Sequence, residues 1–210
     1  MWRKIYVSAV IMTAVMFAGA QAFALASENN FGGVFSPDGS AVDLYKTLKF
    51  DAYKASGTEE QRRTAEEKLA SVKPAAFFIE GVRKIDKRLT LLVIGMMNCP
   101  DCTAVYPYVE AMEPANPFIS VRYLARNDTP GAREFMSSRT GRTNTPSIFI
   151  VRNGKILNRA YVETPSRVTA LLEATKNEEE RDVIWEDFHS GVYDEDIQSD
   201  LLELISNIDD

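Results

Sequence analysis

The sequence predicts an α/β fold in which a central mixed sheet is flanked by helices, with helical additions at both ends of the chain. Short apolar runs alternate with helical segments between residues 89 and 177, which favours a mixed sheet with helices on both sides. Asn153-Gly154 separates two of these runs and is a strong signal for a β-hairpin. The flanking segments, 27–88 and 178–210, instead place apolar residues at helical spacing.

The composition is that of an ordinary globular chain and excludes several functional classes. Its 210 residues are 45% hydrophobic and 26% charged, enough for one sizeable core or two small ones. A formal net charge of −6 argues against a nucleic-acid partner, which usually requires a basic excess. Two Cys and one His are too few for histidine-rich or four-cysteine metal sites, so we expect no metal.

Residues 1–26 have the pattern of a secretory signal peptide. A basic start at Arg3-Lys4 is followed by an apolar run over 5–18 and by small residues ending at Ala26. The run is shorter than the roughly 20 residues that span a bilayer, so we expect cleavage after Ala26, with an uncleaved anchor as the alternative. The predicted location is periplasmic or otherwise extracytoplasmic, and the mature form should not span a membrane.

Residues 27–88 are interpreted as a helical N-terminal extension. Turn-forming residues make 27–40 an irregular lead-in. Helices are expected over 41–54, 59–72 and 74–87. The first is predicted from a stripe formed by Leu44, Tyr45, Leu48, Ala52 and Tyr53. The second opens with a capping box, Thr58 with Gln61 three residues on.

Residues 89–177 carry the predicted sheet. Leu89 to Ile94 is a continuous apolar run, typical of a strand buried on both faces. Further strands are expected over 119–125, 147–151 and 155–162, and helices over 99–112, 130–140 and 165–176. The resulting order is strand, helix, strand, helix, strand, strand, helix.

Residues 178–210 form an acidic tail with an apolar stripe. Thirteen acidic residues and one basic residue, Arg181, give this segment a net charge of −12. Apolar residues nevertheless recur at helical spacing: Ile184, Trp185, Phe188, Ile197, Leu201, Leu204, Ile205 and Ile208. A disordered acidic tail would lack them. The amphipathic helical tail either docks on its own domain or binds a partner, and His189 is expected to be a satisfied or surface histidine.

The chemistry centres on Cys99-Pro100-Asp101-Cys102, between a predicted strand and a predicted helix. Residues i and i+3 of a helix share a face, so the two sulfurs can form a disulfide without backbone rearrangement. Pro100 suits the first helical position. Cys99 then lies at the helix N-terminus, where the dipole favours the thiolate that attacks disulfides, and Cys102 lies one turn inside as the resolving thiol.

With these cysteines, the chain resembles the thioredoxin family over roughly Leu89 to Lys176. The resemblance rests on the cysteine motif, on the element order and on Thr145-Pro146, which lies 44 residues beyond Cys102. It implies a thioredoxin-like fold in which Pro146 is cis and the backbone of Thr145 pairs with an extended substrate segment.

Two departures from the family affect the expected chemistry. Asn98 stands where many members have Trp, and Val93 stands where thioredoxins proper carry a buried acid that serves proton transfer to the second thiol. Asp101, Glu110 or a water would have to substitute for that acid. Because Asp101 places a like charge beside the developing thiolate, a reducing or isomerising role is favoured over a strong oxidant.

The prediction is an exported thiol–disulfide oxidoreductase acting on protein thiols and disulfides, with Cys99 as nucleophile and Cys102 as resolving cysteine. It needs no cofactor beyond the Cys99–Cys102 pair, and a membrane electron donor is a candidate partner. The alternative is a redox-inert binding or chaperone-like module in which Cys99 and Cys102 form a structural disulfide.

Overall fold

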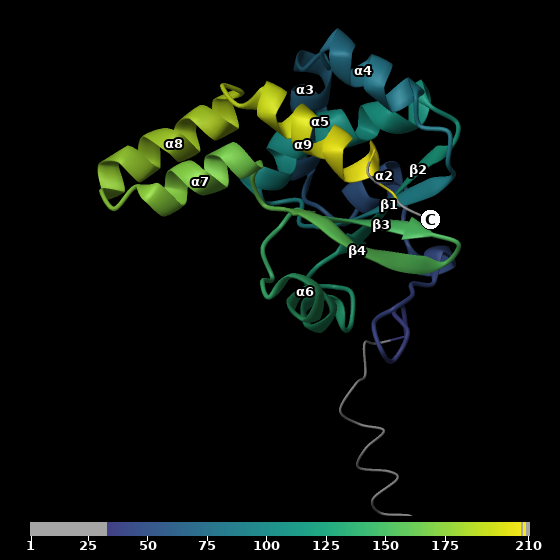
Figure 1. Ribbon diagram of the computed structural model, residues 1–210. Coiled ribbons are helices and arrows are strands. Elements are labelled where there is room, and N and C mark those ends of the chain that lie inside the picture. Colours follow the sequence, from purple (N-terminus) through teal and green to yellow (C-terminus); the bar gives the residue numbers. More distant parts are fainter. Residues whose placement is uncertain (1–32, 207, 209–210) are drawn as a thin grey trace, which may run out of the picture.

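The computed structural model describes residues 33–206 and residue 208 (Figure 1). The predicted signal peptide, residues 1–26, therefore lies outside the described residues. So does the start of the predicted lead-in, residues 27–32.

A four-stranded mixed sheet forms the centre of the molecule. Its strands are β1 (Leu89–Gly95), β2 (Ile119–Ala125), β3 (Ser147–Arg152) and β4 (Lys155–Val162). They lie in the order β2-β1-β3-β4, with β1 parallel to β2 and antiparallel to β3. Asn153 and Gly154 join β3 to β4 with φ values of 51° and 76°, the left-handed pair that a tight hairpin turn requires. The predicted strands and hairpin are confirmed.

Both faces of the sheet are covered, which explains the unbroken apolar run of β1. Leu91 and Val93 face the larger core, and Leu92 and Ile94 face a second core on the opposite side. In Figure 1, α6 (Ala132–Thr140) lies below the sheet, while α5 (Pro100–Ala115) and α9 (Asp194–Ser206) lie above it. The chain thus has the α/β class that its pattern predicts.

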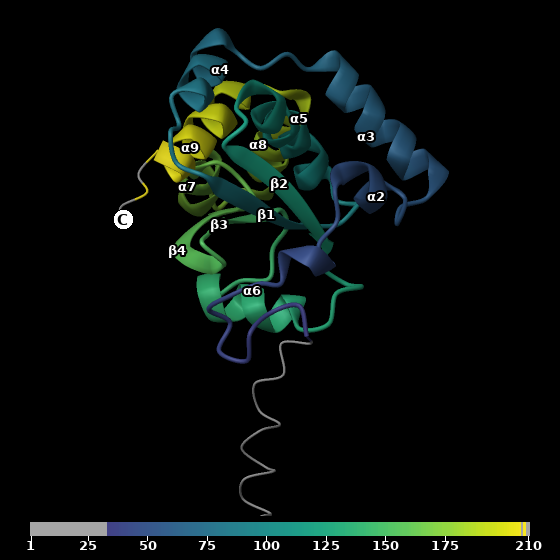
Figure 2. The ribbon, with the colours of Figure 1, turned by 90° about the vertical axis from the view of Figure 1, so that its right-hand side faces the viewer.

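The N-terminal segment contains a short 3-10 helix and three α-helices. These are η1 (Leu44–Lys46), α2 (Phe50–Lys54), α3 (Glu59–Ser71) and α4 (Ala76–Arg83). The capping box that opens α3 is confirmed, since Thr58 and Gln61 exchange both hydrogen bonds. Figure 2 shows α3 along one side of the molecule, beyond α2.

The single helix predicted over residues 41–54 is wrong. Ala41 and Val42 form isolated β-bridges, and the backbone of Leu48 exchanges two hydrogen bonds with Tyr123 of β2. These pairings hold the backbone extended on both sides of η1, at residues 41–42 and at Leu48. Tyr45, which belongs to the expected apolar stripe, is fully exposed. Tertiary hydrogen bonding has overridden a helical pattern that is only weakly periodic.

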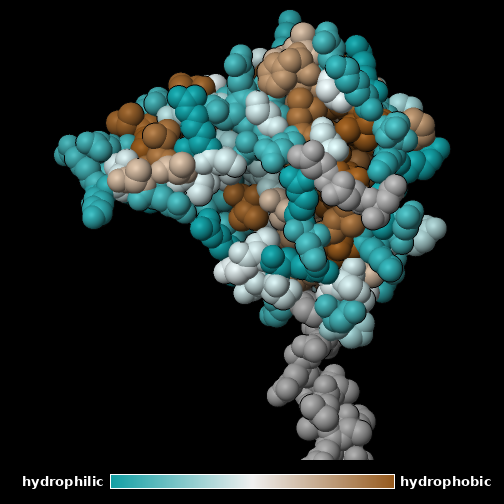
Figure 3. Space-filling model, in the orientation of Figure 1, coloured by the Kyte–Doolittle hydropathy of each residue, from teal (hydrophilic) through white to brown (hydrophobic). Residues whose placement is uncertain are grey.

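The C-terminal tail folds as two helices. These are α8 (Glu178–Ser190) and α9, which follow α7 (Ser166–Ala174). Helix α9 packs against α4, α5 and β4, and its apolar stripe is buried: Ile197, Leu201, Leu204 and Ile205. Helices α7 and α8 lie side by side as an arm whose surface is mostly hydrophilic with small apolar patches (Figures 1 and 3). Within the described residues, no helix is both long and apolar enough to cross a membrane.

Candidate redox-active site

Cys99 lies where the chain leaves β1 and enters α5. It is the N-cap residue of that helix, and Pro100 occupies the first helical position, where no backbone N–H is missed. Cys99 is 7% exposed, whereas Cys102, one turn further, is completely buried. Both are free thiols. Both cysteines are therefore buried, but Cys99 borders a groove and Cys102 is fully enclosed.

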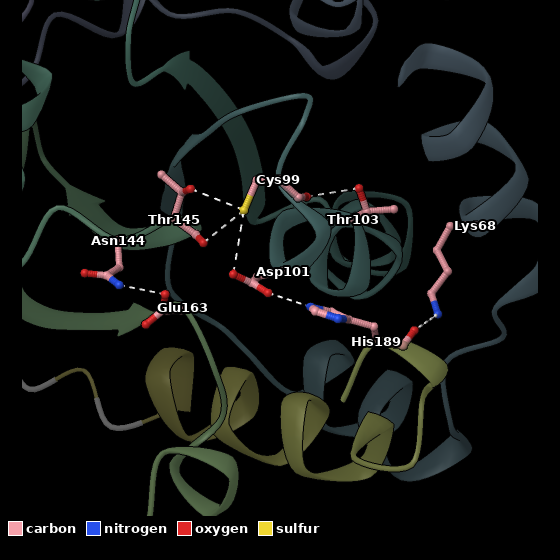
Figure 4. Close-up of polar contacts among 8 residues, drawn as sticks. All are labelled: Lys68, Cys99, Asp101, Thr103, Asn144, Thr145, Glu163 and His189. Atoms are coloured by element: carbon pink, nitrogen blue, oxygen red, sulfur yellow. Dashed lines mark hydrogen bonds and ion pairs between the residues drawn. The ribbon is translucent and has the colours of Figure 1, made fainter. Parts of the chain in front are cut away.

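The loop before β3 brings Thr145 to Cys99. The Thr145–Pro146 peptide bond is cis, as the family resemblance implies. The Cys99 thiol lies 3.3 Å from the carbonyl oxygen of Thr145, and the Thr145 hydroxyl donates to the Cys99 sulfur, also at 3.3 Å (Figure 4). Two segments more than forty residues apart in the chain therefore meet at the reactive sulfur.

Asp101 connects Cys99 to the C-terminal tail. One carboxylate oxygen lies 3.8 Å from the Cys99 sulfur, and the other lies 2.6 Å from Nε2 of His189 in α8 (Figure 4). The His189 ring stacks on Trp185, with 5.8 Å between the ring centroids. The prediction of a satisfied histidine is confirmed, and the partner that satisfies His189 belongs to the cysteine motif.

A groove runs from Cys99 to α3. Its volume is about 670 Å³, and Met97, Cys99, Thr103, Lys68 and His189 are among its lining residues. Lys68 of α3 donates to the backbone carbonyl of His189 at 3.2 Å, which ties α3 to α8 across the groove (Figure 4). Cys99 therefore borders this groove on the side away from Thr145 (Figure 4).

The surroundings of Cys99 favour its thiolate. Hydrogen bonding from Cys102 and from Thr145 lowers the pKa of Cys99 to about 7, against the opposing effects of burial and of the Asp101 charge. The effect of Asp101 has the direction that the sequence predicts. At neutral pH a large fraction of Cys99 is therefore the nucleophilic species.

Cys102 has the opposite character, because burial raises its pKa well above the ordinary thiol value. Val93 is buried and apolar, so it offers no acid at the family position. Of the two residues named from the sequence as substitutes, Asp101 lies beside Cys99, and Glu110 accepts a 2.6 Å hydrogen bond from Tyr123. Among the described residues, no group of three or more Cys, His, Asp or Glu side chains is arranged to hold a metal.

Sequence reasoning missed His189 because nothing local connects it to the cysteines. It lies 88 residues beyond Asp101 and reaches the motif only through the packing of α8. The one available signal was its place beside Trp185 and Phe188, whose apolar side chains must pack on something. That signal indicates docking but not the docking site.

Comparison with known proteins agrees with the fold. The thioredoxin family model matches residues 47–179, well over half of the chain. The chain belongs to the thioredoxin family. No curated protein matches it.

Two solved structures show the same fold. One is a protein of unknown function from Pseudomonas aeruginosa, 20% identical, with a TM-score of 0.63; the match covers 78% of this chain and 94% of that one. The other is an HIV epitope-scaffold, also 20% identical with a TM-score of 0.63, covering 79% and 96%. The family match ends at residue 179, so His189 comes from outside it.

Proposed function

We propose that this protein is an exported thiol–disulfide oxidoreductase that exchanges disulfides with protein substrates. The observation that carries the proposal is the contrast between its two cysteines. Cys99 borders a groove and has a pKa lowered to about 7, and Cys102 is fully enclosed one helical turn away with a raised pKa. A nucleophile and a resolving thiol require this difference.

The reaction proceeds in two exchanges. The Cys99 thiolate attacks a substrate disulfide, a bond forms between Cys99 and one substrate sulfur, and the other sulfur leaves as a thiolate that takes up a proton. The Cys102 thiolate then attacks the Cys99 sulfur, and the second substrate thiolate leaves. The substrate gains two electrons, and a dithiol reductant must later return the Cys99–Cys102 disulfide to its reduced form.

The favoured direction is reduction or isomerisation. Strongly oxidising members of this class hold a nucleophilic thiol with a pKa of about 3.5, which stabilises their reduced form, whereas thioredoxin itself has a pKa of about 7. The value of about 7 at Cys99 matches the second group. Asp101 contributes to it by raising the pKa of Cys99.

A protein substrate and an extracytoplasmic location complete the proposal. The groove beside Cys99 has a volume of about 670 Å³, and the backbone of Thr145 lies on the other side of the sulfur. Export is supported by the N-terminal sequence over residues 1–26 alone. A membrane electron donor is one candidate source of the reducing equivalents.

Trapping of mixed disulfides tests the roles of the two cysteines. With Cys102→Ser, substrates captured by Cys99 cannot be released, so thiol-sensitive adducts should accumulate in cell extracts. Cys99→Ser should trap few, because Cys102 is buried with a raised pKa. The readout is the pattern of adducts on non-reducing gels.

Equal trapping by the two variants would overturn the assignment of nucleophile and resolving thiol. Absence of adducts from both would instead favour a binding module with a structural disulfide.

A further inference from the structure

In the resolving step Cys102 must carry a negative charge, and this chain lacks the buried acid that serves the second thiol in thioredoxins proper. Cys102 must react as a thiolate, yet it is completely buried and its pKa is raised by that burial. Val93 occupies the position from which a carboxylate would serve it. Another polar group must therefore support the negative charge that develops on Cys102.

Two tyrosine hydroxyls meet at Cys102. Tyr106 follows Cys102 by one turn of α5, and its hydroxyl and the Cys102 sulfur lie on the same side of Gly95. The hydroxyl of Tyr53, from α2, lies 2.8 Å from that of Tyr106. Both tyrosine side chains are fully buried.

Gly95, the last residue of β1, leaves the space that this cluster fills. A Cβ atom at this position would lie 2.5 Å from the Tyr106 hydroxyl oxygen, 3.0 Å from that of Tyr53 and 3.3 Å from the Cys102 sulfur. The three polar atoms thus converge on one point beside the strand. Any side chain at Gly95 would displace them.

We propose that the Tyr53–Tyr106 hydroxyl pair takes the place of the missing buried acid and stabilises the Cys102 thiolate by hydrogen bonding during the resolving step. This inference rests on the proposed function, because it assigns groups to one step of that reaction. In this assignment Tyr106 donates to the reacting sulfur, and Tyr53 positions Tyr106 through their 2.8 Å hydrogen bond.

The pair acts as a hydrogen-bond donor and not as a base. Burial raises the pKa values of Tyr53 and Tyr106, so both remain neutral and keep their protons. Tyr53 can donate to Tyr106, which leaves the Tyr106 proton free for the sulfur. The hydrogen bond from Tyr106 lowers the pKa of Cys102, opposing its burial.

The charged groups nearest to Cys102 are the Cys99 thiolate and the Asp101 carboxylate of the same motif, and neither can stabilise a second negative charge. The other ionisable groups that interact with it are tyrosines: Tyr106 of α5, Tyr53 of α2, Tyr123 of β2 and Tyr161 of β4. Burial raises the pKa of each of these tyrosines, so they carry no charge at neutral pH. Once Cys99 is in a mixed disulfide it is neutral too, and hydrogen bonding becomes the main available means of stabilising the Cys102 thiolate.

The step balances without a further reactant. The Cys102 proton passes to solvent, the sulfur electron pair forms the Cys99–Cys102 bond, and the bond between Cys99 and the substrate breaks. The substrate leaves as a thiolate and takes up a proton, so no net proton is consumed. The tyrosines donate hydrogen bonds throughout and are unchanged at the end.

Stopped-flow reaction of the reduced full chain with dithionitrobenzoate separates the two exchanges. Attack by Cys99 releases one coloured thiolate, and attack by Cys102 releases the second. Tyr106→Phe should leave the first rate unchanged, slow the second about tenfold and move its pH midpoint up by about one unit, because a hydrogen bond to a charged group is lost. Tyr53→Phe should slow the second release about threefold.

Tyr108→Phe is the matched control. Tyr108 is a buried tyrosine of the same helix that packs edge-to-face on Phe78 of α4, so its variant should leave the second release and its pH midpoint unchanged. Circular dichroism establishes that each variant is folded. If Tyr106→Phe does not fold, Tyr53→Phe decides the question.

The outcomes separate this inference from the proposed function. If the wild type releases both thiolates, but the tyrosine variants leave the second rate and its pH midpoint unchanged, the role of the tyrosine pair is overturned. The proposed oxidoreductase activity would be unaffected by that result. A wild type that releases only the first thiolate has no resolving step, which would contradict both.

Discussion

Asp101 places a negative charge close to the reactive sulfur of Cys99. Its carboxylate lies between Cys99 and His189, and its charge raises the pKa of Cys99. The hydrogen bond to His189 holds one carboxylate oxygen on the side away from the sulfur. Asp101 therefore opposes the hydrogen bonds from Cys102 and Thr145 that lower the pKa of Cys99.

Alkylation of Cys99 should follow pH with a midpoint of about 7, because the thiolate is the nucleophile and its fraction rises as pH rises through the pKa. Asp101→Asn removes the charge that raises the pKa, so the midpoint should fall by about half a unit. His189→Phe keeps a ring against Trp185 but frees the carboxylate, so the midpoint should rise. Iodoacetamide labelling at a series of pH values, followed by mass spectrometry, measures the pH midpoint of Cys99 alkylation.

Midpoints that move in the same direction in both variants would contradict this account of Asp101. Thr103→Val is a suitable control. Its hydroxyl donates to the Cys99 backbone carbonyl and does not contact the sulfur, so the midpoint should stay in place.

The reactive residues differ in how far the sequence could reveal them. Cys99, Cys102 and Pro100 depend on spacing within one helical turn, and Thr145 and Pro146 on a family pattern, so all five could be named beforehand. His189, Tyr53 and Tyr106 could not be assigned a role. Their importance arises from distant segments that meet only in the folded chain.

At the scale of elements, helix α3 begins at a local capping box and contacts the candidate site near its other end. The reciprocal hydrogen bonds between Thr58 and Gln61 start this helix, and its other end carries Lys68, which contacts the carbonyl of His189. Local signals of this kind make α3 predictable from sequence. The wrongly predicted helix over 41–54 lacked such a cap, and its backbone instead pairs with β2 and β4.

Thr58→Ala should destabilise the protein by about 1 kcal/mol, because the side chain that satisfies the first turn of α3 is lost. Thr58→Ser keeps the hydroxyl and should cost much less. Urea unfolding followed by circular dichroism gives the free energies of unfolding. Equal stability of the alanine variant and the wild type would mean that α3 does not depend on its capping box.

At the scale of the whole molecule, the acidic tail is part of the core. The segment from residue 178 carries a net charge of −12, yet α9 buries its apolar stripe against α4, α5 and β4. None of the described acidic residues of this segment is buried, and the surface of the arm formed by α7 and α8 is mostly hydrophilic (Figure 3). The sequence predicted the stripe but could not show what it packs against, because that depends on the assembled fold.

Leu201→Ala should lower the free energy of unfolding by about 2–5 kcal/mol, since Leu201 is fully buried and its loss leaves a cavity. Val183→Ala on the exposed face of α8 is the control and should change it by less than about 0.5 kcal/mol. Removal of residues 178–210 should abolish cooperative unfolding. A truncated chain as stable as the full one would show that the tail is not part of the core.

The most direct test of the central claim is the redox equilibrium of Cys99 and Cys102. The full chain is equilibrated in glutathione buffers of graded potential, and free thiols are alkylated and counted by mass. The proposed oxidoreductase predicts a reversible two-electron transition above about −300 mV, in which both cysteines change together. A pair that stays oxidised well below about −300 mV would be a structural disulfide and would contradict the proposed function.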